Sequence, residues 1–169
     1  VYAGPACSGD KAKMAKSAGG FLRLSDVEEK GYSALDYRYL CLTAHYRKLL
    51  EFSWEALDGA KIAHRKLRDR AQLLKRDARE DAPMEEWQRH LERFRARVAD
   101  DLDLPGALAS VWEALKPGAL SDPAQLAFLR EADRVLGLDL LADESGLSPE
   151  EQALLDQRVE ARRKKDFKT

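Results

Sequence analysis

Residues 53–77 read SWEALDGAKIAHRKLRDRAQLLKRD, and this stretch decides the fold. Its apolar residues recur three or four positions apart, which is the spacing of one face of an α-helix. Ser53 is a suitable N-cap, and Glu55 in the first turn complements the positive end of the helix dipole. The pattern therefore predicts one long helix with a narrow apolar stripe. The stripe consists of Leu57, Ala60, Leu67, Ala71 and Leu74.

Further helices are predicted on both sides of this one. A short helical turn follows Ser25 and ends at Gly31, and a helix then runs from Ser33 to about Arg47. After residues 53–77, a turn in which Asp81 can serve as N-cap leads to another helix. The core face of that helix carries Trp87, Leu91, Phe94 and Val98, and we expect it to pack on the stripe of residues 53–77.

Proline and glycine mark the boundaries of the remaining helices. Pro105 opens a helix that runs to about Leu115, and Asp122-Pro123 opens another that ends before Gly137. A capping box at residues 148–151 starts the last one. No stretch alternates with a period of two. The sequence predicts an all-α bundle of about five or six helices over residues 32–169, preceded by an irregular loop and connecting segment over residues 1–31.

Composition narrows the class of protein. With 169 residues the chain can form one ordinary domain, and no apolar run approaches the length that crosses a bilayer, so we expect no membrane insertion. The first residues do not read as a secretory signal. Two cysteines give neither a disulfide framework nor a metal-binding spacing. A reduced, cytoplasmic protein is expected.

Charge is distributed unevenly, although the formal net charge is only −1. Residues 61–79 contain eight Lys or Arg residues against two Asp residues, and residues 158–168 contain six basic residues against two acidic ones. Basic helical stretches can follow RNA phosphates, or they can be solvated faces that lie over neighbouring helices. Both interpretations stay open at this point.

Several blocks of the sequence resemble the cysteinyl-tRNA synthetases. The first, Lys13-Met14-Ala15-Lys16-Ser17, is similar to the KMSKS signature of class I aminoacyl-tRNA synthetases, with Ala15 in place of serine. The later blocks occur in the order found in that family and cover nearly the whole chain. They are residues 21–27, 37–47, 50–57, 100–108 and 158–167.

The resemblance implies a C-terminal portion of cysteine-tRNA ligase that supplies an ATP loop and a tRNA-docking bundle. Lys13, Lys16 and Ser17 would belong to the ATP loop, where fixed cations stabilise charge that develops on the leaving phosphates. The alternative is that the lysines are solvated loop charges. The candidates for tRNA binding are Lys61, Arg65, Lys66, Arg68, Arg158, Arg162, Arg163, Lys164 and Lys165.

Other parts of the family's catalytic machinery are missing from this sequence. The His-Ile-Gly-His signature is absent, and the zinc site of the family is not expected here, so we assign no catalytic or metal residue. We expect no catalysis by this chain alone, and ATP would bind only together with a catalytic domain. Two alternatives stay open. The chain could be a non-catalytic module that binds a protein partner at its N-terminal side, or part of a ligase that joins cysteine to an amino sugar.

Polar residues elsewhere have structural explanations. We expect Tyr46 to lie on the apolar stripe of the helix that begins at Ser33, within the core, and His45 to be buried with its polar atoms bonded within the bundle. We leave the roles of Arg38 and Arg47 open. The acidic residues at 100, 101 and 103 are expected to cap a helix and to pair with arginines rather than to bind a metal.

Overall fold

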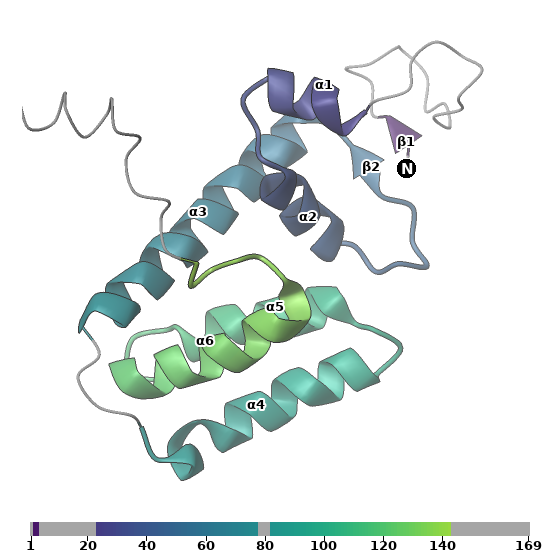
Figure 1. Cartoon of the computed structure of the whole chain (residues 1–169). Helices are drawn as coiled ribbons and strands as arrows, with labels where there is room; N and C mark the ends of the chain where they lie inside the picture. The colour runs from purple at the N-terminus through teal and green to yellow at the C-terminus, as the bar shows by residue number, and fades with distance from the viewer. Residues whose placement is uncertain (1, 4–22, 78–81, 143–169) are drawn as a thin grey trace, which may run out of the picture.

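A computed structural model describes residues 2–3, 23–77 and 82–142 of the chain (Figure 1). It confirms the all-α bundle. The predicted helix that starts at Ser148 lies outside the described residues. The helices are α1 (Leu24–Glu29), α2 (Ala34–Leu42), α3 (Trp54–Asp77), α4 (Met84–Ala99), α5 (Leu104–Ala114) and α6 (Asp122–Leu136), and the strands are β1 (Tyr2–Ala3) and β2 (Glu51–Phe52).

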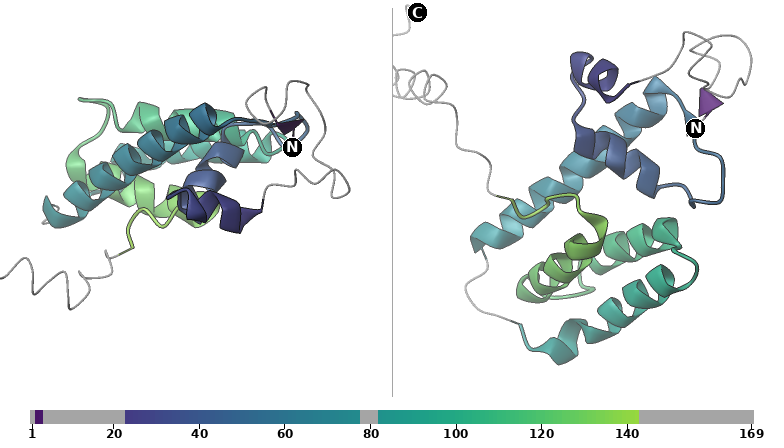
Figure 2. Two further views of the ribbon diagram at one scale, coloured as in Figure 1. Left: turned by 90° about the horizontal axis from the view of Figure 1, so that it is seen from above. Right: turned by 45° about the vertical axis from the view of Figure 1, so that its right-hand side comes forward.

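The helices form two groups, one of α1, α2 and α3 and the other of α4, α5 and α6. Helices α1 and α2 lie beside the N-terminal half of α3, whereas α4, α5 and α6 pack against one another on the other side (Figures 1 and 2). Helix α6 contacts α3 and joins the groups. The expectation that α4 packs on the stripe of α3 is wrong. That stripe is covered by α2 and α6, and α4 instead faces α5 and α6, where Phe94 meets Phe128 edge to face at 6.2 Å between ring centroids.

Side chains at the helix ends explain most of the boundaries. Ser33 and Asp36 form a capping box at the start of α2. The Ser53 hydroxyl accepts a hydrogen bond from the Ala56 amide at 3.0 Å, as its N-cap position predicts. Asp103 caps α5 through the Gly106 amide, also at 3.0 Å.

Two predicted helix boundaries are wrong, the start of α4 and the end of α2. Helix α4 begins after Pro83 as its N-cap, not after Asp81, which lies outside the described residues. Helix α2 ends at Leu42, about five residues before the predicted end at Arg47. At the C-cap, the Thr43 hydroxyl donates to the Leu40 carbonyl at 2.7 Å, a local bond that competes with continuation of the helix. Residues 43–50 therefore form a loop.

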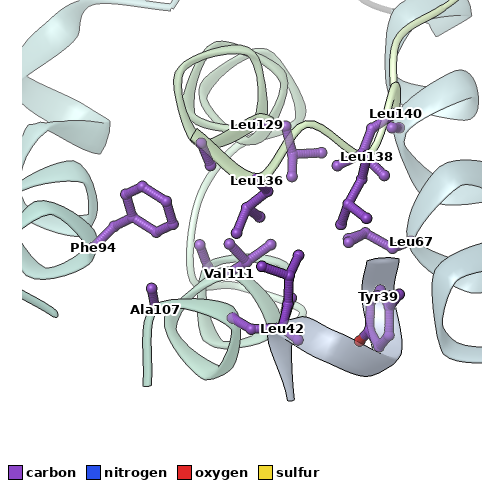
Figure 3. Close-up of a cluster of buried hydrophobic side chains, with 14 of the residues drawn as sticks. Tyr39, Leu42, Leu67, Phe94, Ala107, Val111, Leu129, Leu136, Leu138 and Leu140 are labelled. Carbon is purple, nitrogen blue, oxygen red and sulfur yellow. The ribbon is translucent and has the colours of Figure 1, made fainter. Parts of the chain in front are cut away.

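The hydrophobic core runs between the two groups of helices (Figure 3). Leu42 from α2, Leu67 from α3, Val111 from α5 and Leu136 from α6 converge there, and all four are buried. The chain after α6 continues this core, because Leu138 and Leu140 are fully buried in an irregular segment. The predicted stripe of α3 is also buried along its whole length.

A short parallel pairing was not predicted. Tyr2 of β1 lies opposite Glu51 of β2, and Ala3 lies opposite Phe52. Each strand has two residues, which is too short for an alternating pattern to appear in the sequence. Phe52 is fully buried, so β2 also fixes the start of α3 to the core.

Gly137 ends α6 in a left-handed conformation, with φ of +60°. Gly137→Ala is expected to lower the free energy of unfolding by about 1–2 kcal/mol, because an L-residue is strained there. The new Cβ would also lie 2.9 Å from a guanidinium nitrogen of Arg38. Urea denaturation measures the loss. Gly59→Ala is the control: it places a Cβ in open space within α3 and should raise stability by about 0.5–1 kcal/mol. Equal stabilities of the two variants would contradict this assignment.

Candidate nucleic-acid interface

Several basic side chains of α3 are bound to neighbouring parts of the fold. The Lys61 ammonium donates to the Gly31 carbonyl at 2.8 Å and lies over the Tyr32 ring at 4.9 Å. Arg70 binds Asp122 at 2.6 Å and also the side chain of Gln125, both on α6. Lys75 donates to the backbone after α6. For these residues, the interpretation that basic side chains lie over neighbouring elements is the better one.

The outward face of α3 retains a smaller set of predicted RNA-binding residues. Arg65 and Lys66 are exposed, and Arg68 is half-buried. Arg65 is 3.9 Å from Asp69, but the side chains are 82% and 68% exposed, so the pair is solvated and weak. Arg65 and Lys66 can therefore meet a polyanion without disturbing a neighbouring helix. We call these two residues the α3 basic pair.

A buried hydrogen-bonded pair on the inner side of α3 was missed by the sequence reasoning. The His64 Nδ1 lies 2.8 Å from the Asp36 carboxylate on α2, and its Nε2 lies 3.3 Å from the Leu138 carbonyl. The two ring nitrogens thus face a carboxylate on one side and a backbone carbonyl on the other. His64 falls between Ala60 and Leu67 on the apolar stripe, and that position was the signal. The pair joins α2, α3 and the chain after α6.

The carboxylate of this pair is held in its ionised form. Burial alone disfavours the charged carboxylate of Asp36. Hydrogen bonds from His64 and Ser33 outweigh that cost, so the pKa of Asp36 lies below its ordinary value of 3.8. Since the carboxylate also caps α2, one residue serves both the helix end and the contact between helices.

The expectation that Tyr46 and His45 belong to the core is wrong for Tyr46. Because α2 ends at Leu42, Tyr46 falls in the loop of residues 43–50 and is 57% exposed. His45 is half-buried and stacks on the Tyr46 ring, with 5.0 Å between ring centroids. The loop thus carries a stacked aromatic pair whose Tyr46 member is exposed.

The two arginines whose roles were open have different partners. Arg38 donates from Nε to the Leu136 carbonyl at 2.6 Å, so it satisfies the C-terminal end of α6. Arg47 pairs with Asp101 at 2.9 Å, in the connection between α4 and α5.

Asp103 pairs with Arg97 at 3.2 Å in addition to capping α5. The acidic stretch therefore serves caps and arginines, as expected. Among the described residues, no group of three or more His, Cys, Asp or Glu side chains could hold a metal ion.

A pocket of about 580 Å³ lies between this loop and the helices beside it. Its lining is basic and apolar. The described lining residues are Arg38, Cys41, Leu42, Ala44, His45, Tyr46, Arg47, Lys48, Leu49, Leu50 and Leu104. No carboxylate is among these lining residues, so the pocket favours an anionic or aromatic group over a cation.

The other predicted site residues are not placed by the structure. The ATP-loop residues Lys13, Lys16 and Ser17 lie outside the described part of the chain. So does the second basic stretch, with Arg158, Arg162, Arg163, Lys164 and Lys165. No helix in the part of the chain that the structure describes is both long enough and apolar enough to cross a membrane.

Comparison with known proteins gives relatives that share one description. The chain is 40% identical to cysteine–tRNA ligase 1 of Burkholderia lata and 40% identical to cysteine–tRNA ligase of Novosphingobium aromaticivorans, with 92% of the chain covered in each case. It is 32% identical to cysteine–tRNA ligase of Treponema denticola over 94% of the chain. No family model matches the chain.

The match covers only part of each relative. The chain spans 32% of the Burkholderia protein, 34% of the Novosphingobium protein and 38% of the Treponema protein. It thus corresponds to about a third of a relative's length, whereas the relatives match nearly all of it. On this evidence of sequence, supported by an all-α fold, the chain belongs to the cysteine–tRNA ligase family and corresponds to a portion of its members.

Proposed function

We propose that the chain is the tRNA-docking portion of a cysteine–tRNA ligase and also carries the ATP loop of that enzyme. In the complete enzyme it would contribute to ATP-dependent attachment of cysteine to tRNA. The observation that carries this proposal is the 40% identity, over 92% of the chain, to proteins described as cysteine–tRNA ligases. Catalysis would require the remaining two-thirds of such a protein.

The described surface supports the docking role through charge. The α3 basic pair is exposed, and the other basic residues of α3 that contact neighbours fix this helix in the bundle. A rigid helix that presents cations to solvent can follow RNA phosphates without reading the sequence. The basic residues of 158–168 would add contacts to RNA phosphates in this proposal.

The ATP loop has a distinct role in this proposal. Lys13 and Lys16 would stabilise negative charge on the triphosphate as pyrophosphate leaves, and Ser17 would add a hydroxyl donor. Ala15 removes one hydroxyl relative to the family signature but leaves both lysines. The zinc of the family would be held elsewhere in the complete enzyme.

Filter binding of a cysteine tRNA transcript tests the docking role. We expect the isolated chain to retain tRNA at low salt. The logarithm of the association constant should fall linearly with the logarithm of the salt concentration, with a slope of about −0.9 for each duplex phosphate that is neutralised. An acidic protein of similar size is the control. Retention of tRNA no better than that control would overturn the docking role and favour the non-catalytic protein-binding module.

A further inference from the structure

The Tyr46 ring is fixed although more than half of it is exposed. Its hydroxyl donates to Asp101 Oδ1 at 2.7 Å and accepts from Arg47 Nε at 2.8 Å. Arg47 also donates to Asp101 from Nη2 at 3.0 Å, which closes a triangle of three side chains. His45 stacks on the same ring. We call these four residues the Tyr46 platform.

The connection between α4 and α5 delivers the carboxylate to this platform. Asp101 and Leu102 both have left-handed backbones, with φ of +51° and +54°. Such a conformation is strained for a residue other than glycine. The Arg47–Asp101 pair is exposed and therefore too weak to offset that strain by itself. The contacts order an exposed aromatic ring rather than add greatly to stability.

Basic side chains lie beside the fixed ring, and Arg47 among them is paired with Asp101. Arg38, Arg47 and Lys48 line the adjoining pocket of about 580 Å³, and no carboxylate is among the described residues that line it. Lys48 is exposed, so its ammonium is accessible to a ligand. An exposed aromatic ring beside cations is the arrangement that binds single-stranded nucleic acid, because a base stacks on the ring while its phosphate meets the cation.

We propose that the Tyr46 platform and Lys48 bind an unpaired nucleotide of RNA, with the base stacked on Tyr46 and the flanking phosphate near Lys48. This site rests on the proposed tRNA-docking function and deepens it, because it adds a contact to single-stranded RNA to the phosphate contacts of α3. Ordering of the ring before binding reduces the entropy that a base must overcome to stack there.

A protein partner is the competing occupant, because Leu49 and Leu102 are 67% and 50% exposed near the platform. The composition of the site favours RNA. Lysine is depleted at protein–protein interfaces, whereas the exposed Lys48 in the lining of this pocket suits a phosphate. The polar triangle lies at the Tyr46 hydroxyl, His45 stacks on the ring and the Arg47 guanidinium carbon lies 5.4 Å from its centroid. A base would therefore stack on the exposed part of the ring that His45 and Arg47 leave open, since Tyr46 is 57% exposed.

Fluorescence anisotropy with a labelled single-stranded RNA of about 12 nucleotides tests the site, and the same strand annealed to its complement is the second probe. Tyr46→Ala is expected to weaken binding of the single strand about fivefold to a hundredfold and to leave duplex binding unchanged. Tyr46→Phe keeps the ring and should retain most of the affinity. For the single strand, Lys48→Ala should make the slope of the logarithm of the association constant against the logarithm of the salt concentration less steep by about 0.7. Circular dichroism verifies the fold of each variant.

Different results would overturn different claims. If the wild-type chain binds the tRNA transcript but Tyr46→Ala and Lys48→Ala bind the single strand as the wild type does, the platform is not an RNA site and the docking function stands. If the wild type binds no tRNA, the docking function itself fails. Leu49→Ser, which changes the exposed apolar surface and keeps the ring, should leave RNA affinity within about twofold. Loss of RNA affinity in Leu49→Ser with none in Tyr46→Ala would also contradict the assignment.

Discussion

Replacing His64 with alanine is expected to lower the free energy of unfolding by about 3–5 kcal/mol, because it leaves the ionised Asp36 carboxylate buried without its hydrogen bond from His64. The side chains of His64 and Asp36 are only 6% and 9% exposed, so water cannot replace the lost contact easily. The substitution also removes the bond to the Leu138 carbonyl, which joins α3 to the chain after α6. Urea denaturation monitored by circular dichroism gives the loss.

A double-mutant cycle separates the pair from simple loss of packing. Asp36→Ala alone removes a cap of α2 as well as the partner of His64. In the double variant, neither polar group is left buried alone, so the combined loss should be smaller than the sum of the two single losses by at least about 1 kcal/mol. Strict additivity would mean that His64 and Asp36 do not form the hydrogen-bonded pair described above.

The lowered pKa of Asp36 predicts that the stability of the fold depends on pH. The pKa of Asp36 is lower in the folded chain than in the unfolded chain, so the unfolded chain binds its proton first as the pH falls. The contribution of Asp36 is therefore fully present well above its ordinary pKa of 3.8 and is lost as the pH falls through the lower folded value. Wild type should lose stability more steeply than Asp36→Asn between about pH 5 and pH 2. Parallel curves would contradict this.

The second large effect is expected at Phe94. Its side chain is 1% exposed and meets Phe128 of α6 edge to face. Phe94→Ala should lower the free energy of unfolding by about 3–5 kcal/mol, because it leaves a cavity between α4 and α6 and removes the aromatic contact. Phe94→Leu retains most of the volume and should lose much less. A loss below about 1 kcal/mol for the alanine variant would mean that α4 does not pack on α6 as described.

Helix identity and helix faces could be predicted from the sequence, because both depend on local patterns. The stripe from Leu57 to Leu74, the N-caps Ser53 and Asp103 and the stop at Gly137 all follow from spacing and from the chemistry of single residues. Asp103 was also expected to serve as a cap and an arginine partner, and it does both.

Contacts between distant segments could not be predicted in the same way. The pattern of α4 shows an apolar face but not which helix covers it, and α6 rather than α3 does so. The Tyr46 platform depends on the early end of α2 and on Asp101, which lies 55 residues further along the chain. His64 occupies an apolar stripe position, so only the fold reveals that its partner is a carboxylate on α2.

The most direct test of the tRNA-docking account is the salt dependence of tRNA binding by a charge-reversal variant of α3. Arg65→Glu with Lys66→Glu reverses the α3 basic pair. Lys116→Glu with Arg134→Glu is the matched control, because it changes the net charge equally at side chains that are 65% and 76% exposed. We predict that reversal on α3 weakens binding about tenfold or more and flattens the salt slope, whereas the control binds nearly as the wild type does. Equal losses in both variants would show that binding follows net charge alone and would contradict the assignment of α3 as the surface that docks tRNA.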